Sequence, residues 1–157
     1  MKIILSFVVL FFAGMFAQAQ QAHEITHWNI SVNNPDFKIG DEIEIVIKCT
    51  IEEGWHLYSS DFAPDCGPIP TTINFENNNT LETKGEIQAV NSHKSYDDLF
   101  ECDIADFSGK GVFTQKIKVK ALELNITSTG SYQVCKEDGI CLAGKINFNE
   151  VITSSIK

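Results

Sequence analysis

The chain has 157 residues and a formal net charge of −9, because 21 acidic residues outnumber 12 lysines and no arginine is present. Proteins hold nucleic-acid phosphates mainly with arginine and lysine, so this composition excludes nucleic acid as an expected partner. The length suits one domain with its own hydrophobic core.

The first 19 residues have the pattern of a secretory signal peptide. Lys2 supplies a positive start, residues 3–16 are almost wholly apolar, and Ala17-Gln-Ala19 places small residues at the spacing that signal peptidase reads. An uncleaved membrane anchor is the alternative, but the apolar run is too short to span a bilayer comfortably. We therefore expect cleavage after Ala19 and a mature domain of residues 20–157. That domain is expected to be exported and soluble, without a membrane span, in a compartment where disulfides persist.

The first half of the mature chain predicts short strands separated by turns. Residues 23–32 indicate a first strand. Residues 43–51 show the clearest pattern, because apolar side chains alternate with mostly polar ones and give the strand one buried face. Cys49 lies on that face and is expected to be a buried thiol. Further strands are expected at residues 55–58, 71–76 and 86–90, with a loop rich in proline, aspartate and glycine at residues 59–70.

The second half continues this pattern after one interruption. Residues 91–106 break the alternation and are expected to form an ordered loop, in which apolar side chains sit among five acidic ones. Many short strands with turns between them, and no amphipathic helix, predict an all-β fold of the sandwich type. The remaining expected elements are strands at 111–120 and 122–126, a turn at 128–130, a hairpin at 132–142 and a last strand at 145–151.

The chain contains five cysteines, an odd number that leaves at least one thiol free. Cys135 and Cys141 flank a turn-like insert in which Gly139 can take the positive φ of a tight reversal. The residues on either side suit strands, which predicts a β-hairpin with the two sulfurs near its tip. Facing residues on antiparallel strands lie about 4.5–5.5 Å apart at Cα, a separation that suits a disulfide. Cys66 and Cys102 both sit in loop-like segments and are a possible second disulfide, which the sequence leaves open.

Two roles compete for the Cys135–Cys141 pair. A structural staple around so small a ring stabilises the fold by only about 2 kcal/mol on the chain-entropy model, and would leave a non-enzymatic binding or structural module. A redox pair benefits from close spacing, because the second sulfur stays at hand to resolve a mixed disulfide. Spacing alone leaves both roles open.

Neither a metal nor a cofactor is expected. The cysteine pair lacks the Cys-x-x-Cys spacing of zinc sites, and the four histidines form no ligand motif. No glycine-rich phosphate loop is present in the sequence.

The residues around the pair resemble those of a known family. The order Tyr132-Gln-x-Cys-x5-Cys, near the end of an exported β domain, is similar to the N-terminal periplasmic domain of the DsbD thiol:disulfide interchange proteins. Gly54-Trp-His-Leu-Tyr58 resembles that family's Gly-aromatic-x-Leu-Tyr strand, and Gly67-Pro-Ile-Pro70 occupies the loop that follows it. Tyr96-Asp-Asp-Leu-Phe100 resembles the acidic and aromatic segment called the cap loop. The resemblance covers nearly the whole mature chain, with the motifs in the family's order.

The resemblance implies an immunoglobulin-like β-sandwich and the activity of a protein-disulfide reductase. Electrons would pass from a thioredoxin-like or membrane-embedded donor protein to oxidised periplasmic thiol proteins. Cys141 would exchange with partners, and Cys135 would be the resolving sulfur. The cap over the pair would be formed by Tyr96, Asp97, Asp98, Leu99 and Phe100.

The chain also departs from the family pattern. Leu142-Ala-Gly144 follows the second cysteine where the family often continues with prolines, and Cys66 and Cys102 are extra relative to that pattern. The chain ends where full-length members continue into a membrane domain, so we expect a separately encoded electron donor.

Overall fold

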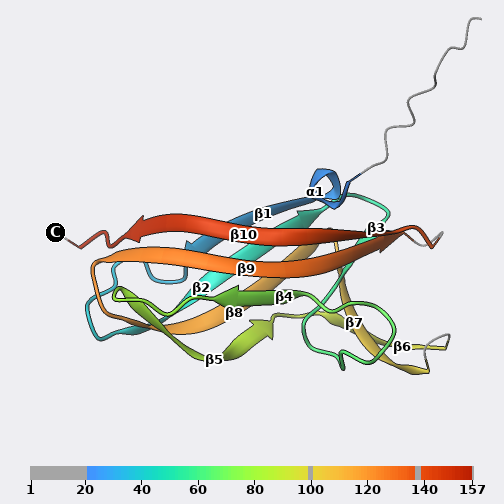
Figure 1. Ribbon diagram of the computed structural model, residues 1–157, viewed down its shortest axis with the longest axis horizontal. Coiled ribbons are helices and arrows are strands. Elements are labelled where there is room, and N and C mark those ends of the chain that lie inside the picture. Colours follow the sequence, from blue (N-terminus) through green and yellow to red (C-terminus); the bar gives the residue numbers. More distant parts are fainter. Residues whose placement is uncertain (1–20, 99–100, 137–138, 157) are drawn as a thin grey trace, which may run out of the picture.

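The computed structural model describes residues 21–98, 101–136 and 139–156 (Figure 1). The expected signal peptide, residues 1–19, lies outside this described part. The elements in chain order are α1 (Ala22–Ile25), β1 (Thr26–Val32), β2 (Glu42–Ile51), β3 (Trp55–Tyr58), β4 (Thr72–Phe75), β5 (Leu81–Ala89), β6 (His93–Asp97), β7 (Cys102–Ser108), β8 (Lys110–Val119), β9 (Glu123–Lys136) and β10 (Cys141–Thr153).

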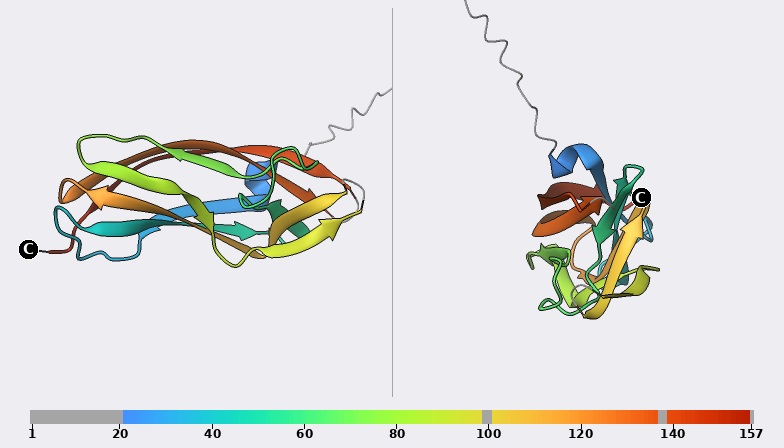
Figure 2. Two further views of the ribbon diagram at one scale, coloured as in Figure 1. Left: turned by 90° about the horizontal axis from the view of Figure 1, so that it is seen from below. Right: turned by 90° about the vertical axis from the view of Figure 1, so that its right-hand side faces the viewer.

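The strands form two antiparallel sheets that pack face to face. One sheet has the order β1-β2-β8-β5, and the other has the order β10-β9-β3-β7-β6, with β4 also pairing with β9. Seen from below, β1 and β2 lie in one layer while β9 and β10 run along the other (Figure 2). This arrangement is an immunoglobulin-like β-sandwich and confirms the predicted fold class.

The main core lies between the two sheets and is built from alternate residues of the strands. Ile45 of β2 and Phe113 of β8 are fully buried in one sheet, and Leu57 of β3 and Val134 of β9 meet them from the other. Each large side chain buried in this way stabilises the fold by about 1.5–3 kcal/mol. Cys49 lies on the same buried face of β2 with no exposed surface, which confirms its predicted burial.

The start of the described chain differs from the prediction. The sequence predicts a strand from residue 23, whereas the structure has the short helix α1 first and β1 only from Thr26. Two reciprocal hydrogen bonds hold this turn, from Gln21 N to Glu24 Oε2 (3.2 Å) and from Glu24 N to Gln21 O (3.0 Å). Ala22 and Ile25 are both buried and lie three residues apart, as on one face of a helical turn. Strand alternation has a period of two residues, so it does not predict this turn.

The prediction of an ordered loop at residues 91–106 is wrong, because most of this segment is the antiparallel hairpin of β6 and β7. β6 lies at the edge of its sheet with mainly exposed or half-buried side chains, so the strand needs no apolar alternation. β7 buries the adjacent residues Ile104 and Ala105 and then Phe107, which also departs from a period of two. The acidic residues of this segment therefore belong to a pair of strands that alternation does not predict.

The turn predicted at residues 128–130 is also wrong, because β9 runs through it from Glu123 to Lys136. Gly130 pairs with Ile73 of β4, and a β-carbon at Gly130 would collide with the backbone of Thr72. The glycine is therefore needed for the close approach of two strands and not for a reversal of the chain.

The predicted cysteine hairpin is formed by β9 and β10. Its register is continuous, from Cys135 opposite Cys141 at the tip to Glu123 opposite Thr153 at the far end. Gly139 in the connection has a φ of +88°, the positive value expected for this reversal.

An aromatic ring fixes the position of this hairpin on the rest of the fold. Tyr132 of β9 lies opposite Gly144 of β10, and its ring occupies the space where a Gly144 β-carbon would stand. The Tyr132 hydroxyl shares a 2.7 Å hydrogen bond with Thr26 Oγ1, and the ring packs against Trp28 with centroids 5.2 Å apart. The hairpin is thus tied to β1 only three residues before Cys135.

We expect Gly144→Ala to lower the free energy of unfolding by roughly 1–3 kcal/mol, the usual cost of overpacking. The added methyl group displaces the Tyr132 ring, which is buried and held by its hydroxyl. Urea unfolding measures the change. Ala143→Ser, on the exposed neighbouring position, is the matched control and should change the value by less than about 0.5 kcal/mol. Equal unfolding free energies of the two variants would show that the Tyr132 ring can move aside without destabilising the fold.

Candidate functional site

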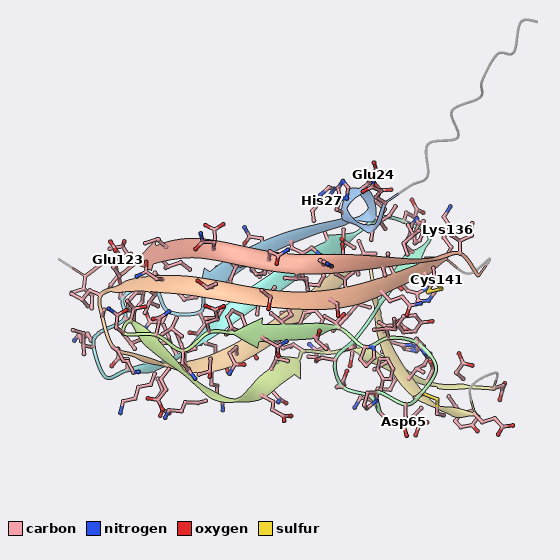
Figure 3. The ribbon with its side chains drawn as sticks, in the orientation of Figure 1. Glu24, His27, Asp65, Glu123, Lys136 and Cys141 are labelled. Atoms are coloured by element: carbon pink, nitrogen blue, oxygen red, sulfur yellow. A yellow bond between two sulfur atoms is a disulfide. The ribbon has the colours of Figure 1, made fainter. Side chains whose placement is uncertain are left out.

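Cys135 and Cys141 form a disulfide across the tip of the β9–β10 hairpin, with their Cα atoms 4.1 Å apart. This separation is slightly shorter than the one that the sequence predicts. The two residues differ sharply in accessibility, since Cys135 is 2% exposed and Cys141 lies exposed at the end of the molecule (Figure 3). A partner protein can therefore reach one sulfur of the bond far more easily than the other.

The strand register places four residues in a row across one sheet. Cys141 of β10 faces Cys135 of β9, Cys135 faces His56 of β3, and His56 faces Ser108 of β7. Directly facing residues project from the same side of a sheet. The alternate residues of β3 and β9, Leu57 and Val134, point the other way into the main core. The disulfide therefore lies on the outer face of the sandwich.

A second, smaller hydrophobic cluster covers this part of the outer face. We call it the outer cluster. Its four buried residues come from β3, β7, β9 and the loop of residues 59–70, and two half-buried side chains pack against them. The members are Tyr58, Cys66, Ile104 and Cys135, with Phe62 and Cys102 packed against them. Cys135 is thus one wall of a cluster that is separate from the main core.

Gln133 connects the loop of residues 59–70 to the buried sulfur. Its side-chain nitrogen donates to Cys135 Sγ at 3.6 Å, and its side-chain oxygen accepts from the Ile69 N–H at 2.8 Å. No role is predicted for Gln133 from the sequence, although the residue stands in the Tyr-Gln-x-Cys motif. Its position two residues before Cys135 on one strand was the available signal, because such residues share a face.

Tyr58 of the outer cluster interacts with three titratable side chains, His56, Asp97 and Asp106. Its hydroxyl is 3.3 Å from His56 Nε2, and the two rings meet edge to face with centroids 5.2 Å apart. Burial raises the pKa of Tyr58 above its ordinary value, and the carboxylates of Asp97 and Asp106 raise it further. Asp97 of β6 therefore acts electrostatically on a side chain that packs in the same cluster as Cys135.

The residues predicted to form a cap are only partly placed by the structure. Tyr96 and Asp97 belong to β6, and Asp98 lies in the turn after it. The Tyr96 side chain is 59% exposed. Leu99 and Phe100 lie outside the described residues.

The β6–β7 hairpin, the loop of residues 59–70 and the tip of the cysteine hairpin all lie at one end of the molecule (Figure 1). Asp61 of the loop joins it to the β6 side, through Lys94 Nζ at 3.2 Å and Ser92 Oγ at 2.9 Å. Partial burial acts to raise the pKa of Asp61, but hydrogen bonds from Ser59, Ser92 and Lys94 lower it below its ordinary value. Asp61 therefore stays ionised and holds the two segments together.

A second disulfide joins the same two segments. Cys66 of the loop is bonded to Cys102 at the start of β7, with Cα atoms 5.9 Å apart. Cys49 is the free cysteine, and burial raises its pKa to about 12, so its reactive thiolate is scarce at neutral pH.

The part of the chain that the structure describes contains no cluster of three or more histidine, cysteine or acidic residues that could hold a metal ion. Within the same residues, no helix has the length and apolar character needed to cross a membrane.

Comparison with known proteins gives a matching family, and the similar solved structures include two N-terminal domains. The family model described as thiol:disulfide interchange protein DsbD, N-terminal, matches residues 29–152. The DsbD N-terminal domain of Neisseria meningitidis in the reduced form has a TM-score of 0.51 and 12% identity, over 85% of this chain and 93% of that chain. The N-terminal periplasmic domain of ScsB from Proteus mirabilis has a TM-score of 0.55 and 12% identity, over 80% of this chain and 46% of that chain. At such identities the structures show a shared fold alone. No curated protein sequence matches the chain.

The two disulfides should contribute unequally to stability. We expect the double variant Cys66→Ala with Cys102→Ala to lose about 4 kcal/mol of unfolding free energy, because the bond closes a loop between residues 36 apart. The matched double variant Cys135→Ala with Cys141→Ala closes a loop between residues only 6 apart and should lose about 2 kcal/mol. Urea unfolding of both variants under oxidising conditions measures the difference. A larger loss from the hairpin pair would contradict this ranking.

Proposed function

The chain belongs to the family of DsbD N-terminal domains, and we propose that its Cys135–Cys141 pair carries reducing equivalents between proteins in the periplasm. The family assignment makes the chain a thiol–disulfide exchange domain, with oxidoreductase activity of that general kind. The direction of electron flow, the partners and the roles of individual residues are the content of the proposal.

The observation that carries the proposal is the unequal exposure of the two sulfurs. A partner's thiolate must approach the sulfur that it attacks, and exposed Cys141 offers that approach while Cys135 is 2% exposed. The partner's sulfur bonds to Cys141, the disulfide breaks, and Cys135 leaves as a thiolate that takes up a proton. A second thiolate of the donor then attacks the donor sulfur of the mixed disulfide. Cys141 leaves as a thiolate, and the pair is reduced.

The reduced pair reverses these roles when it meets an oxidised protein. The Cys141 thiolate attacks the target disulfide and forms a mixed disulfide, and the Cys135 thiolate then attacks Cys141 to release the reduced target. The Gln133 amide, which donates to Cys135 Sγ, favours the thiolate form of that sulfur. Each exchange transfers two electrons by forming one disulfide bond and breaking another, so the cycle needs no cofactor.

The partners follow from this chemistry and from the family. We infer that the donor is a thioredoxin-like or membrane-embedded protein with a reactive dithiol, and that the acceptors are oxidised periplasmic proteins. Residues 1–19 act in this proposal as the signal peptide that directs the domain of residues 20–157 to the periplasm. The activity is then that of a protein-disulfide reductase.

The segment Tyr96–Phe100 has the role of a cap in this proposal. Support comes from Asp97, whose charge acts on Tyr58 in the outer cluster. A carboxylate near the sulfurs disfavours a thiolate and slows exchange with unwanted reagents. Docking of the correct partner displaces the segment and starts the exchange.

The reduction potential separates a redox pair from a structural bond. We expect the Cys135–Cys141 pair to titrate at a potential above about −300 mV, since structural disulfides lie below that value. Equilibration in glutathione or dithiothreitol buffers, followed by alkylation and mass analysis, measures it. The Cys66–Cys102 bond serves as the internal control and should stay oxidised where the hairpin pair is reduced. A lower potential for the hairpin pair would mark it as a staple and overturn the proposed function.

Trapping of mixed disulfides tests the roles of the two sulfurs. Cys135→Ser, expressed in the periplasm, should accumulate adducts with thioredoxin-like proteins through Cys141, because the resolving sulfur is absent. Cys141→Ser is the matched control and should yield far fewer adducts, because its remaining sulfur is buried. Non-reducing gels and mass spectrometry identify the adducts. Adducts from Cys141→Ser alone would reverse the assignment, and adducts from neither variant would contradict exchange.

A further inference from the structure

The buried position of Cys135 creates a requirement for a proton acceptor. The resolving step needs the Cys135 thiolate, but burial disfavours a thiolate. Cys49 shows this effect in the same protein, because burial raises its pKa to about 12. Cys135 is 2% exposed, so bulk water has little access to its proton. A side chain that accepts this proton would therefore accelerate the step.

His56 is placed for this task by the strand register. It faces Cys135 directly from β3, on the side opposite Cys141. Directly facing residues of antiparallel strands have Cβ atoms about 4.5–5.5 Å apart and project from the same face. The other histidines lie elsewhere, with His23 in α1, His27 in β1 and His93 in β6.

The orientation of the His56 ring is also fixed. Its Nε2 lies 3.3 Å from the Tyr58 hydroxyl, and the Tyr58 ring meets it edge to face. Tyr58 itself is held in the outer cluster beside Cys135. The His56 imidazole is itself half-buried, which limits its freedom to turn away from Cys135.

We propose that His56 accepts the proton of the Cys135 thiol when that sulfur resolves a mixed disulfide on Cys141, an inference that rests on the proposed exchange function. The Cys135 proton moves to the imidazole, and the Cys135 thiolate attacks Cys141 Sγ. The Cys135–Cys141 bond forms, the bond from Cys141 to the target breaks, and the target leaves as a thiolate. The imidazolium then releases its proton to that thiolate or to water. In the reverse direction the imidazolium protonates Cys135 as it leaves.

Several charged or titratable side chains lie around His56. Acidic groups favour the imidazolium, and cationic groups oppose it. They are Tyr58 on its own strand, Cys135 and Lys136 on β9, Asp106 on β7, and Glu52 and Glu53, which line the same pocket as His56. Lys136 Nζ lies over the neighbouring Trp55 ring, 5.3 Å from its centroid.

The test separates the two steps of exchange with a small aromatic disulfide that releases a coloured thiolate. The reduced domain releases one thiolate when Cys141 attacks the reagent and a second when Cys135 resolves the adduct. Cys135→Ser gives the first phase alone and defines its rate. Stopped-flow traces are recorded between about pH 5 and pH 9, a range that includes the ordinary pKa of histidine near 6.5.

In the unaltered protein we expect the second phase to accelerate with rising pH through the histidine range, because the neutral imidazole is the acceptor. His56→Phe keeps an aromatic ring against Tyr58, and His56→Gln keeps a group that can bond to its hydroxyl. In both variants the pH profile of the second phase should lose its inflection in the histidine range. The second phase should be about tenfold slower at neutral pH, with the rate of the first phase unchanged. His27→Phe, on an exposed histidine of the other sheet, is the matched control and should behave like the unaltered protein.

The outcomes distinguish this inference from the function on which it rests. An inflection that persists in either His56 variant overturns the role of His56 and leaves the exchange function intact. A second phase that is absent from the unaltered protein overturns the exchange function, and the role of His56 with it.

Discussion

The pairing of β9 with β10 is the constraint on which the site depends. This register sets Cys135 opposite Cys141 and Tyr132 opposite Gly144. The buried side chain of Tyr132 then ties the hairpin to Thr26 at the start of β1. A shift of one residue would turn every side chain of the strand to the other face. It would remove Cys135 from the outer cluster and Tyr132 from its place over Gly144. The same packing that stabilises the fold therefore also positions the Cys135–Cys141 pair.

The site is built on the outer face of the sandwich, where a loop and a hairpin cover the sheet. The loop of residues 59–70 supplies Phe62 and Cys66 to the outer cluster, and the β6–β7 hairpin supplies Ile104. The Cys66–Cys102 bond and the Asp61–Lys94 ion pair join these two covering segments. Cys135 is buried by this small cluster while Cys141 remains outside it. The difference between the two sulfurs is thus a consequence of tertiary packing on one face of a sheet.

Strand alternation was a good guide where a strand has one face in the main core, and a poor one elsewhere. The pattern around Ile43–Ile51 gave β2 and its buried face, because that strand lies between two neighbours and buries every second side chain. β6 does not show this pattern, because it is an edge strand with mostly exposed or half-buried side chains. Gly130, where the sequence predicts a turn, lies inside β9. That glycine serves a close contact with Thr72. A residue that is conspicuous in sequence can serve a contact with a strand almost sixty positions away.

Local alternation, turn residues and short motifs are enough to predict the all-β class, the cysteine hairpin and the resemblance to the DsbD N-terminal domains. Tertiary structure alone decided which sulfur is exposed and that His56 and Gln133 flank the buried one. It also decided that Asp97 influences Tyr58. The physical reason is that burial and neighbouring charge depend on strand register and on segments folded over the sheet. Cys135 and Cys141 occupy matching positions on the two arms of the hairpin. The packing of the outer cluster buries Cys135 and leaves Cys141 exposed.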